Sequence, residues 1–296
     1  MTGSGPEPGD TAPVRPHLGN GASVRQRLLE IGYLADELIA DAMFLADSLG
    51  KPLLIEGPAG VGKTELAKAA AALTGARLLR LQCYEGLDEA KALYEWNYKK
   101  QLLRIQVGER SWQDAEADIF TEDFLLERPL LAAIRAADPV VLLIDEVDRV
   151  EVETEALLLE VLSDFQVSIP ELGTVIARQR PLVFLTSNAT RELSEALRRR
   201  CLYLHIDYPD TERERQIIQL KVPGISTDLA SQAARVLHTL RGLDLTKPPS
   251  IAEAVDWARS LVLLGITEID SPAVVRTLPV LAKNRKDMER AAAALG

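Results

Sequence analysis

The chain has 296 residues, with 44 acidic against 34 basic side chains and a formal net charge of −10 at pH 7. Nucleic-acid backbones and anionic lipid surfaces are bound by clustered lysine and arginine, so this charge disfavours a protein that binds either of them. A hydrophobic content of 47% with 26% charged residues is that of an ordinary globular protein, and the length fits one large domain or two smaller ones.

The first residues carry acidic side chains and lack the apolar core of a secretory signal, and no stretch approaches the ~20 apolar residues of a membrane-spanning helix. We therefore expect a cytoplasmic protein without stable membrane insertion. Its two cysteines, Cys83 and Cys201, and its three single histidines provide neither a disulfide framework nor a pair at zinc-ligand spacing.

Residues 1–21 include five glycines and four prolines with few large apolar side chains, which predicts a disordered tail. A helical spacing of apolar residues then runs from Val24 to Gly50, a residue type common just beyond a helix end. Five short apolar runs separated by helical patterns follow, at residues 52–56, 78–82, 140–144, 182–186 and 202–206. This alternation predicts an α/β domain over residues 22–209 with a five-stranded parallel sheet covered on both faces. Residues 210–296 show only helical patterns and predict a smaller all-α domain.

A glycine-rich motif lies between the first apolar run and a helical pattern. Glycines let the backbone turn so that successive N–H groups face phosphate oxygens, and the next helix adds the positive end of its dipole. The motif consists of Gly57, Pro58, Ala59, Gly60, Val61, Gly62, Lys63 and Thr64. In this G-x-x-x-x-G-K-[ST] pattern we expect Lys63 to contact the β- and γ-phosphates of ATP and Thr64 to hold Mg²⁺.

Two later apolar runs end in polar side chains. Asp145 and Glu146 follow one run and Asn188 follows another, and ligands of parallel sheets bind at the carboxyl ends of the strands. We expect Asp145 to enter the Mg²⁺ shell and Glu146 to orient or deprotonate the attacking water. Asn188 is a candidate to orient the same water or to touch the γ-phosphate, although an asparagine also suits a plain turn after a strand.

Arg198, Arg199 and Arg200 stand just before the fifth apolar run. They are either a solvated basic face or the source of an arginine finger, which reaches a neighbouring subunit's nucleotide and stabilises charge on its γ-phosphate. Their spacing does not choose among the three.

The order of the glycine-rich motif, the acidic pair, Asn188 and Arg200, followed by a helical domain, resembles a AAA+ ATPase over almost the whole chain from Val24. Three stretches are similar to the MoxR family, in the branch of accessory ATPases encoded with carbon monoxide dehydrogenase: residues 55–69, 81–98 and 145–174. The resemblance implies that the chain carries Walker A, Walker B and sensor 1 at these positions. It makes Arg200 the preferred arginine finger.

Three further segments fit the resemblance. Residues 94–106 alternate large and polar side chains, like the β-hairpin inserted into helix two of this clade, which would face the pore of a ring; ordinary core packing explains the same aromatic stripe. Residues 166–174 resemble the pre-sensor hairpin, with residues 171–173 at its turn. Residues 31–33 resemble a stretch that lines the adenine, which makes Tyr33 a nucleotide-binding candidate.

One position departs from the family. The MoxR lid offers a sensor 2 arginine where this chain has Ala252, whose methyl group cannot contact a phosphate. Either another basic residue such as Lys247 takes its place, or the lid couples weakly to the γ-phosphate and hydrolysis is slow without a partner.

The resemblance implies a Mg²⁺-dependent ATPase that forms a homo-oligomeric ring, six subunits being the family expectation, and acts as a chaperone without binding nucleic acid. It also implies a partner with a von Willebrand factor A domain and a metalloenzyme client, such as a molybdenum hydroxylase like carbon monoxide dehydrogenase. Two alternatives stay open: a slow nucleotide-dependent switch or scaffold, and a metal-chelatase-like motor subunit. The net charge disfavours a DNA motor, and a small-molecule kinase would leave Asn188 and the arginine triplet unexplained.

Overall fold

The computed structural model describes residues 18–107 and 119–295, which form two compact units. The first unit comprises the described residues up to 204, apart from residues 32–34 and 56–65. These two short segments belong with residues 205–295 in the second unit. The glycine-rich motif is therefore grouped with the C-terminal helices rather than with most of the sheet.

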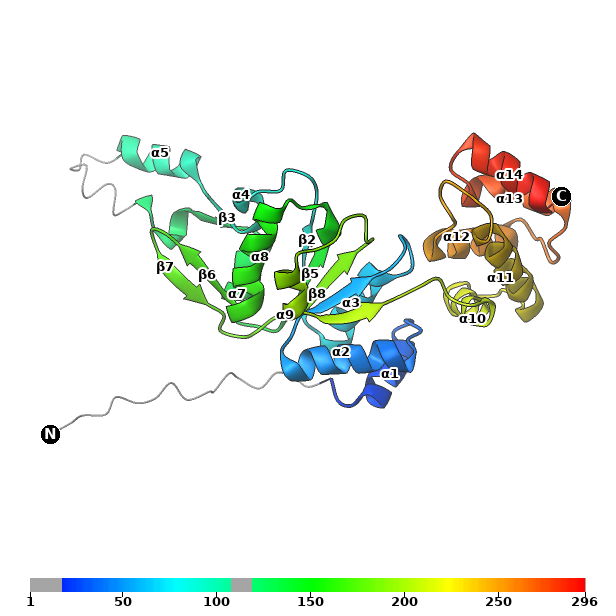
Figure 1. Cartoon of the computed structure of the whole chain (residues 1–296), viewed down its shortest axis with the longest axis horizontal. Coiled ribbons are helices and arrows are strands. Elements are labelled where there is room, and N and C mark those ends of the chain that lie inside the picture. Colours follow the sequence, from blue (N-terminus) through cyan, green and yellow to red (C-terminus); the bar gives the residue numbers. More distant parts are fainter. Residues whose placement is uncertain (1–17, 108–118, 296) are drawn as a thin grey trace. The chain divides into compact units, whose positions relative to one another are not determined.

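The first unit is built on a five-stranded sheet in the order β2-β5-β8-β1-β9 (Figure 1). Its strands are β1 (Leu53–Glu56), β2 (Arg77–Gln82), β5 (Val140–Asp145), β8 (Leu182–Ser187) and β9 (Leu202–His205). Strand β5 runs parallel to both β2 and β8. All five predicted apolar runs form strands, and the predicted fold class is confirmed.

Strands β5 and β8 are buried along their whole length. Their continuous Val, Leu, Ile and Phe residues are typical of strands covered on both faces, and α7 (Pro129–Arg135) packs against β2 and β5. Helix α8 (Val152–Asp164) contacts the short helix α9 (Glu195–Arg200). Because a strand buried in this way accommodates charge only at its end, the acidic pair falls where β5 leaves the sheet.

Two helices precede the sheet where the apolar pattern predicted one. Helix α1 spans Gly21–Glu30 and α2 spans Glu37–Leu49. Gly32 has a φ of 80°, which right-handed helices exclude, and the Asp36 side chain caps the start of the second helix. Helix α2 ends, as expected, at Gly50 in the left-handed conformation with a φ of 60°.

The predicted tail extends too far along the chain. Residues 1–17 lie outside the described residues, but Leu18 is 1% exposed and its amide donates to the Asp47 carboxylate at 3.1 Å. Asn20 caps α1, which begins at residue 21. The packed chain therefore includes residues 18–21, since burial of Leu18 and the cap stabilise this segment.

The predicted hairpin over residues 94–106 is wrong in its extent. The segment contains β3 (Tyr94–Trp96), which pairs antiparallel with β4 (Leu125–Glu127), and then α5 (Tyr98–Val107). Asn97 explains the change of structure, because its side chain accepts the amide of Lys100 at 3.0 Å and so starts a helix. Trp96 is buried and meets Phe120 edge to face, so this part of the aromatic stripe is core.

The pre-sensor hairpin forms where the resemblance placed it. Strands β6 (Gln166–Ile169) and β7 (Gly173–Ile176) pair antiparallel. The Leu172 amide donates to the Ile169 carbonyl at 3.0 Å and closes the turn between them. The two strands lie side by side in Figure 1.

The second unit carries the helical lid. Its helices are α10 (Thr211–Lys221), α11 (Thr227–Arg241), α12 (Ile251–Leu263), α13 (Ser271–Leu281) and α14 (Arg285–Leu295). They pack around Trp257, which is fully buried and whose indole N–H donates to the Thr277 hydroxyl at 2.8 Å. A buried ion pair joins α10 to α11, with two guanidinium nitrogens of Arg241 each 2.7 Å from a carboxylate oxygen of Glu214. Arg241 also donates to the Pro249 carbonyl at 2.9 Å and fixes the chain just before α12.

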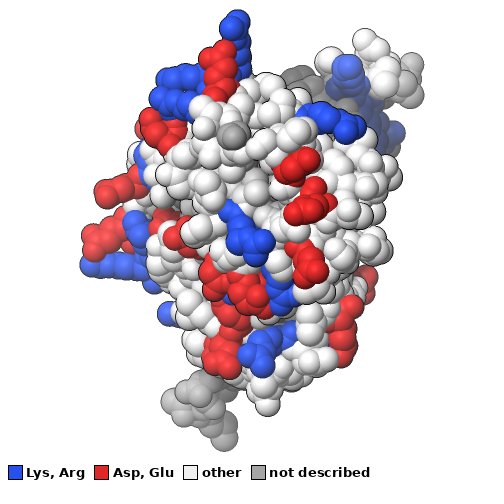
Figure 2. All heavy atoms as spheres, turned by 90° about the vertical axis from the view of Figure 1, so that its right-hand side faces the viewer, with Lys and Arg blue, Asp and Glu red and all other residues white. Residues whose placement is uncertain are grey.

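On the face shown in Figure 2, basic and acidic side chains are interspersed rather than gathered by sign. A phosphate-backbone site needs clustered positive charge, so this face lacks the pattern of a nucleic-acid surface. Within the described residues, no helix combines the length and the apolar character needed to cross a bilayer.

Candidate functional site

The glycine-rich loop connects β1 to helix α3 (Lys63–Thr74). The Lys63 side chain is 6% exposed, and its ammonium donates to the carbonyls of Gly57 at 2.6 Å and Pro58 at 2.8 Å. Lys63 is the first residue of α3, and its side chain thus reaches back to the beginning of the loop. Helix N-termini favour anions through their free N–H groups and their dipole, so this loop has the construction of a phosphate-binding site.

Two of the glycines are required by close neighbours. A Cβ at Gly57, whose φ is 152°, would lie 1.9 Å from the Ile206 carbonyl oxygen. A Cβ at Gly60, whose φ is 79°, would lie 2.2 Å from the Ser250 Cβ. The Gly60 carbonyl accepts the amide of Ile251 at 2.9 Å, so the loop is bonded directly to the start of α12.

Sequence reasoning missed the lid residues that hold this loop. Ser250 caps α12 by accepting the amide of Glu253 at 3.1 Å, and the Glu253 carboxylate accepts the Ser250 amide at 2.9 Å. The S-x-x-E spacing of this capping box is visible in the sequence and marks the helix start. Tyr208 donates its hydroxyl to the Ala59 carbonyl at 3.3 Å, a contact that no local pattern signals. Tyr33 belongs to the same compact unit and is partly exposed.

The sensor 2 position lies in the first turn of α12. Ala252 is exposed, so the position has room for a longer side chain. Lys247, the alternative basic residue, places its ammonium 3.3 Å from the Glu253 carboxylate. Lys247 thus has an acidic partner within the lid.

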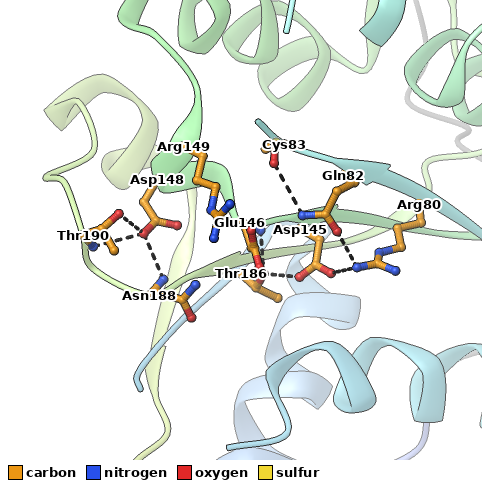
Figure 3. A network of polar contacts seen from close by, with 10 residues as sticks. All are labelled: Arg80, Gln82, Cys83, Asp145, Glu146, Asp148, Arg149, Thr186, Asn188 and Thr190. Carbon is orange, nitrogen blue, oxygen red and sulfur yellow. Dashed lines mark hydrogen bonds and ion pairs between the residues drawn. The ribbon is translucent and has the colours of Figure 1, made fainter. Parts of the chain in front are cut away.

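The acidic pair lies at the end of β5 in a network that also includes β2 and β8 (Figure 3). Asp145 is 3% exposed; its Oδ1 accepts the Thr186 hydroxyl at 2.5 Å and its Oδ2 accepts from Arg80 at 2.5 Å. The amide of Glu146 donates to the same Thr186 hydroxyl at 2.9 Å. Neither Arg80 nor Thr186 belongs to a motif seen in the sequence.

Negative charge accumulates around this strand end. Burial, and then the charges of Asp145, Asp148 and Glu146, raise the pKa of the Cys83 thiol to about 12. Arg80 already places a cation against Asp145, so the position accepts positive charge. Mg²⁺ prefers oxygen ligands, and the carboxylate of Asp145 and the hydroxyl of Thr64 are of this kind.

Glu146 is held on two sides. Its backbone has a φ of 58°, which is uncommon for a residue with a side chain, and its carboxylate lies 2.7 Å from Arg149 Nε. Glu146 is 32% exposed and Arg149 is 55% exposed at their side chains, so solvent screens this pair.

Asn188 lies in the same network through its backbone. Asp148 Oδ2 accepts the amide of Asn188 at 3.2 Å, the amide of Thr190 at 3.0 Å and the Thr190 hydroxyl at 2.6 Å. Burial by itself raises the pKa of Asp148, but these hydrogen bonds outweigh it and lower the pKa below the ordinary 3.8. Asp148 therefore fixes the loop on which Asn188 stands, including Ala189 with a φ of 56°.

The three candidate arginines occupy the last turn of α9 and are all exposed. Arg200 donates to the Ser163 hydroxyl and, at 3.1 Å, to the Ala196 carbonyl, while Arg199 pairs with Glu195. These contacts are separate from the network around Asp145. Arg198 lies over the Tyr203 ring, 5.8 Å from its centroid.

Replacing Gly60 by alanine tests the contact between the loop and α12. We expect Gly60→Ala to weaken ATP binding more than about tenfold, because the new Cβ forces the loop and Ser250 apart. The matched control is Gly75→Ala, since Gly75 has a φ of 66° but no atom within 4 Å of the added Cβ. Both variants carry the ~1–2 kcal/mol cost of a left-handed alanine. Titration with a fluorescent ATP analogue separates them; equal affinity in both would contradict the contact.

The Asp148 hydrogen bonds predict a pH-dependent contribution to stability. Because folding lowers the Asp148 pKa, its contribution is complete above the ordinary value of 3.8 and is lost as the pH falls through the folded-state pKa. Asp148→Ala should lower the free energy of unfolding by about 1–3 kcal/mol near neutral pH, with a smaller loss in strong acid. Urea denaturation from about pH 6 to about pH 3 measures this difference. A difference that stays constant over this range would show that the carboxylate is not held in this way.

The chain is similar in sequence to several known proteins. The chain is 26% identical over 258 residues to Protein NorQ of Paracoccus denitrificans, covering 84% of this chain and 85% of that protein. It is also 26% identical over 233 residues to an uncharacterised protein of Staphylococcus haemolyticus, with 76% of this chain and 80% of that protein covered. Midasin of Dictyostelium discoideum is 31% identical over 173 residues, which are 55% of this chain and 3% of that protein.

Solved structures show a related fold. A proline-to-glycine mutant of RuvB from Thermotoga maritima superposes with a TM-score of 0.51 at 19% identity, covering 90% of this chain and 73% of that one. The match extends over the α/β core and the helical region, in agreement with the predicted architecture. At this identity the similarity concerns the fold alone.

The family match covers β1, β2, β5 and β8 of the sheet, the glycine-rich loop and the acidic pair. Residues 52–201 match the family described as AAA domain (dynein-related subfamily). Together these similarities confirm the AAA+ ATPase of the MoxR type that the motifs predicted. The chain therefore belongs to the dynein-related subfamily of AAA domains, and it is an ATPase.

Proposed function

We propose that this ATPase hydrolyses Mg²⁺-ATP through the residues of its glycine-rich loop and its acidic pair. Lys63 and the loop backbone from Gly57 bind the β- and γ-phosphates, and Tyr33 lines the adenine. Thr64 and Asp145 hold Mg²⁺, which neutralises charge developing on the phosphates. The observation that carries the proposal is the adjacent carboxylates at the end of a buried strand, in a chain that also has this loop.

The acidic pair divides the work. Asp145 is buried and bonded through both oxygens, as suits a residue with a fixed position. Glu146 has a partly exposed carboxylate and orients or deprotonates the attacking water. Asn188 assists from the loop that Asp148 holds. Because phosphoryl transfer depends on positioning and on charge stabilisation, this arrangement fits hydrolysis.

We further propose that the protein works as a homo-oligomeric ring of six subunits, with Arg200 acting on a neighbour's γ-phosphate. The exposure of Arg200 at the end of α9 supports this role, and its bonds to Ser163 and Ala196 hold the side chain in place. Within the ring, hydrolysis moves the lid and remodels a client. The family resemblance favours a cytoplasmic chaperone with a von Willebrand factor A partner and a metalloenzyme client, such as carbon monoxide dehydrogenase.

Two alternative functions share the nucleotide site but differ in the use of ATP hydrolysis. The alanine at the sensor 2 position favours a slow nucleotide-dependent switch or scaffold, because the lid then has no arginine at that position to sense the γ-phosphate. A metal-chelatase-like motor subunit would share the ring and the ATPase cycle but act on a metal-inserting partner. Rapid turnover by the isolated protein would exclude the switch.

ATPase rate against protein concentration tests the ring. We expect the rate per subunit to rise with concentration and to track a ring-sized particle in light scattering with ATP and Mg²⁺. Glu146→Gln should lower turnover by about 100-fold or more, and Arg200→Ala by a similar factor, since a finger contributes about 10³–10⁵ in related sites. The matched control is Arg199→Ala on the same helix turn, where the arginine pairs with Glu195.

The outcomes have separate meanings. The ring would be contradicted by a monomeric protein whose rate per subunit does not change with concentration or in Arg200→Ala. The nucleotide-dependent switch would then remain. Equal losses in Arg199→Ala and Arg200→Ala would instead assign the effect to the charge of α9 rather than to one finger.

Restoring an arginine at the sensor 2 position tests the lid. We expect Ala252→Arg to raise turnover by at least about tenfold, because a cation placed toward developing negative charge stabilises the transition state. Ala293→Arg, at an exposed position of α14, controls for added charge on the lid. Unchanged turnover and unchanged ATP affinity in Ala252→Arg would show that this position does not limit the cycle.

A further inference from the structure

A single buried hydroxyl lies between the two acidic residues at the end of β5. It belongs to Thr186, which donates to Asp145 Oδ1 at 2.5 Å and accepts the amide of Glu146 at 2.9 Å. Thr186 is 1% exposed and Asp145 is 3% exposed. Water does not replace a partner lost at this depth, so both hydrogen bonds carry their full desolvation cost if broken.

We propose that Thr186 is a positioning residue for ATP hydrolysis, which fixes the Asp145 carboxylate and the Glu146 backbone relative to each other. The inference rests on the proposed roles of Asp145 toward Mg²⁺ and of Glu146 toward water. A threonine hydroxyl has one proton, and here Asp145 receives it, so a lone pair is left to face the Glu146 amide. The two hydrogen bonds therefore fix the Thr186 hydroxyl in one orientation, in which it contacts both Asp145 and Glu146.

The sheet register explains how β8 supplies this group. Ile144 of β5 pairs with Leu185 of β8, so Asp145 and Thr186 are the next residues of two adjacent strands. Glu146 then turns out of the sheet with a φ of 58°, a conformation that costs free energy in a residue with a side chain. The bond from its amide to Thr186 stabilises that turn and sets the direction in which its side chain leaves the strand.

The two oxygens of Asp145 have different surroundings. Oδ1 meets the buried, neutral hydroxyl of Thr186, whereas Oδ2 meets Arg80, whose side chain is 48% exposed. A charged group that reaches solvent exchanges partners more readily than a buried hydroxyl that bonds two ways. Thr186 thus keeps the carboxylate plane in place while the partner at Oδ2 changes.

Three variants separate positioning from simple stabilisation. Thr186→Val replaces the hydroxyl by a methyl group of similar size, and Thr186→Ser keeps the hydroxyl. The matched control is Thr277→Val in the lid. Thr277 is 2% exposed, accepts the Trp257 indole N–H at 2.8 Å and donates to the Ala273 carbonyl at 2.7 Å, so its change to valine also removes one donated and one accepted hydrogen bond from a buried hydroxyl, but in the second unit rather than at the acidic pair.

We expect Thr186→Val to lower kcat by about 10–100-fold and to raise the Mg²⁺ concentration for half-maximal rate by about tenfold, as is common when the partner of a metal-binding carboxylate is removed. Binding of a fluorescent ATP analogue in EDTA should stay within about twofold, because the loop around Lys63 is unaltered. Thr186→Ser should stay within about threefold of the wild type in kcat. Thr277→Val should keep kcat and the Mg²⁺ midpoint, even where its melting temperature falls as far as that of Thr186→Val.

Wild-type kcat and a wild-type Mg²⁺ midpoint in folded Thr186→Val would overturn the proposal. A loss of kcat in Thr277→Val as large as that in Thr186→Val would also overturn it. Circular dichroism at the assay temperature verifies folding. If Thr186→Val does not fold, Thr186→Cys, with a weakly bonding thiol, is measured against Thr186→Ser.

The Glu146→Gln variant separates a failure of the proposed function from a failure of the role of Thr186. If that variant hydrolyses ATP at the wild-type rate, the proposed roles of the acidic pair fail; if it is inactive while Thr186→Val is unimpaired, only the role of Thr186 fails.

Discussion

A carboxylate at the end of a strand buried on both faces is the constraint around which the first unit is arranged. Asp145 is 3% exposed, so its charge is tolerated only with partners for both oxygens. Strand β2 supplies one partner, Arg80, and β8 supplies the other, Thr186. The parallel registers of β2 and β8 with β5 keep these two partners beside Asp145. A slip of either strand by one residue would turn its partner residue to the opposite face of the sheet.

The second unit depends on a close backbone contact between the glycine-rich loop and the start of α12. The glycine-rich loop can approach the start of α12 closely only because Gly60 has no side chain, and its carbonyl caps the helix through the Ile251 amide. The start of α12 is in turn fixed by the Ser250 capping box and by Arg241, which is buried against Glu214 and donates to Pro249. The loop and the start of α12 are thus held together by a direct hydrogen bond.

The sequence predicted what repeats regularly or forms a known pattern. The apolar runs became strands and the glycine-rich motif became a loop before a helix, because burial and glycine conformation are local properties. Residues 98–106 were predicted as part of a hairpin because large and polar side chains alternate there, whereas the Asn97 side chain starts a helix at this point. Thr186 and Arg80 gave no signal, since a threonine in an apolar run is an ordinary strand residue and the partner of an arginine is set by register. Such contacts depend on strand order, which no single segment encodes.

The proposed water-orienting residue shows how rigidity and freedom are combined at one position. The backbone of Glu146 is strained, and strained conformations persist where surrounding contacts over-determine them. Here the buried Thr186 hydroxyl supplies that contact, while the Glu146 carboxylate pairs with the half-exposed Arg149. An exposed ion pair contributes little free energy, about 0–1 kcal/mol, whereas a buried hydrogen bond leaves an unsatisfied group when it breaks. The backbone is therefore the fixed part and the carboxylate the part free to change partners, which is the division that a residue orienting a water molecule during turnover requires.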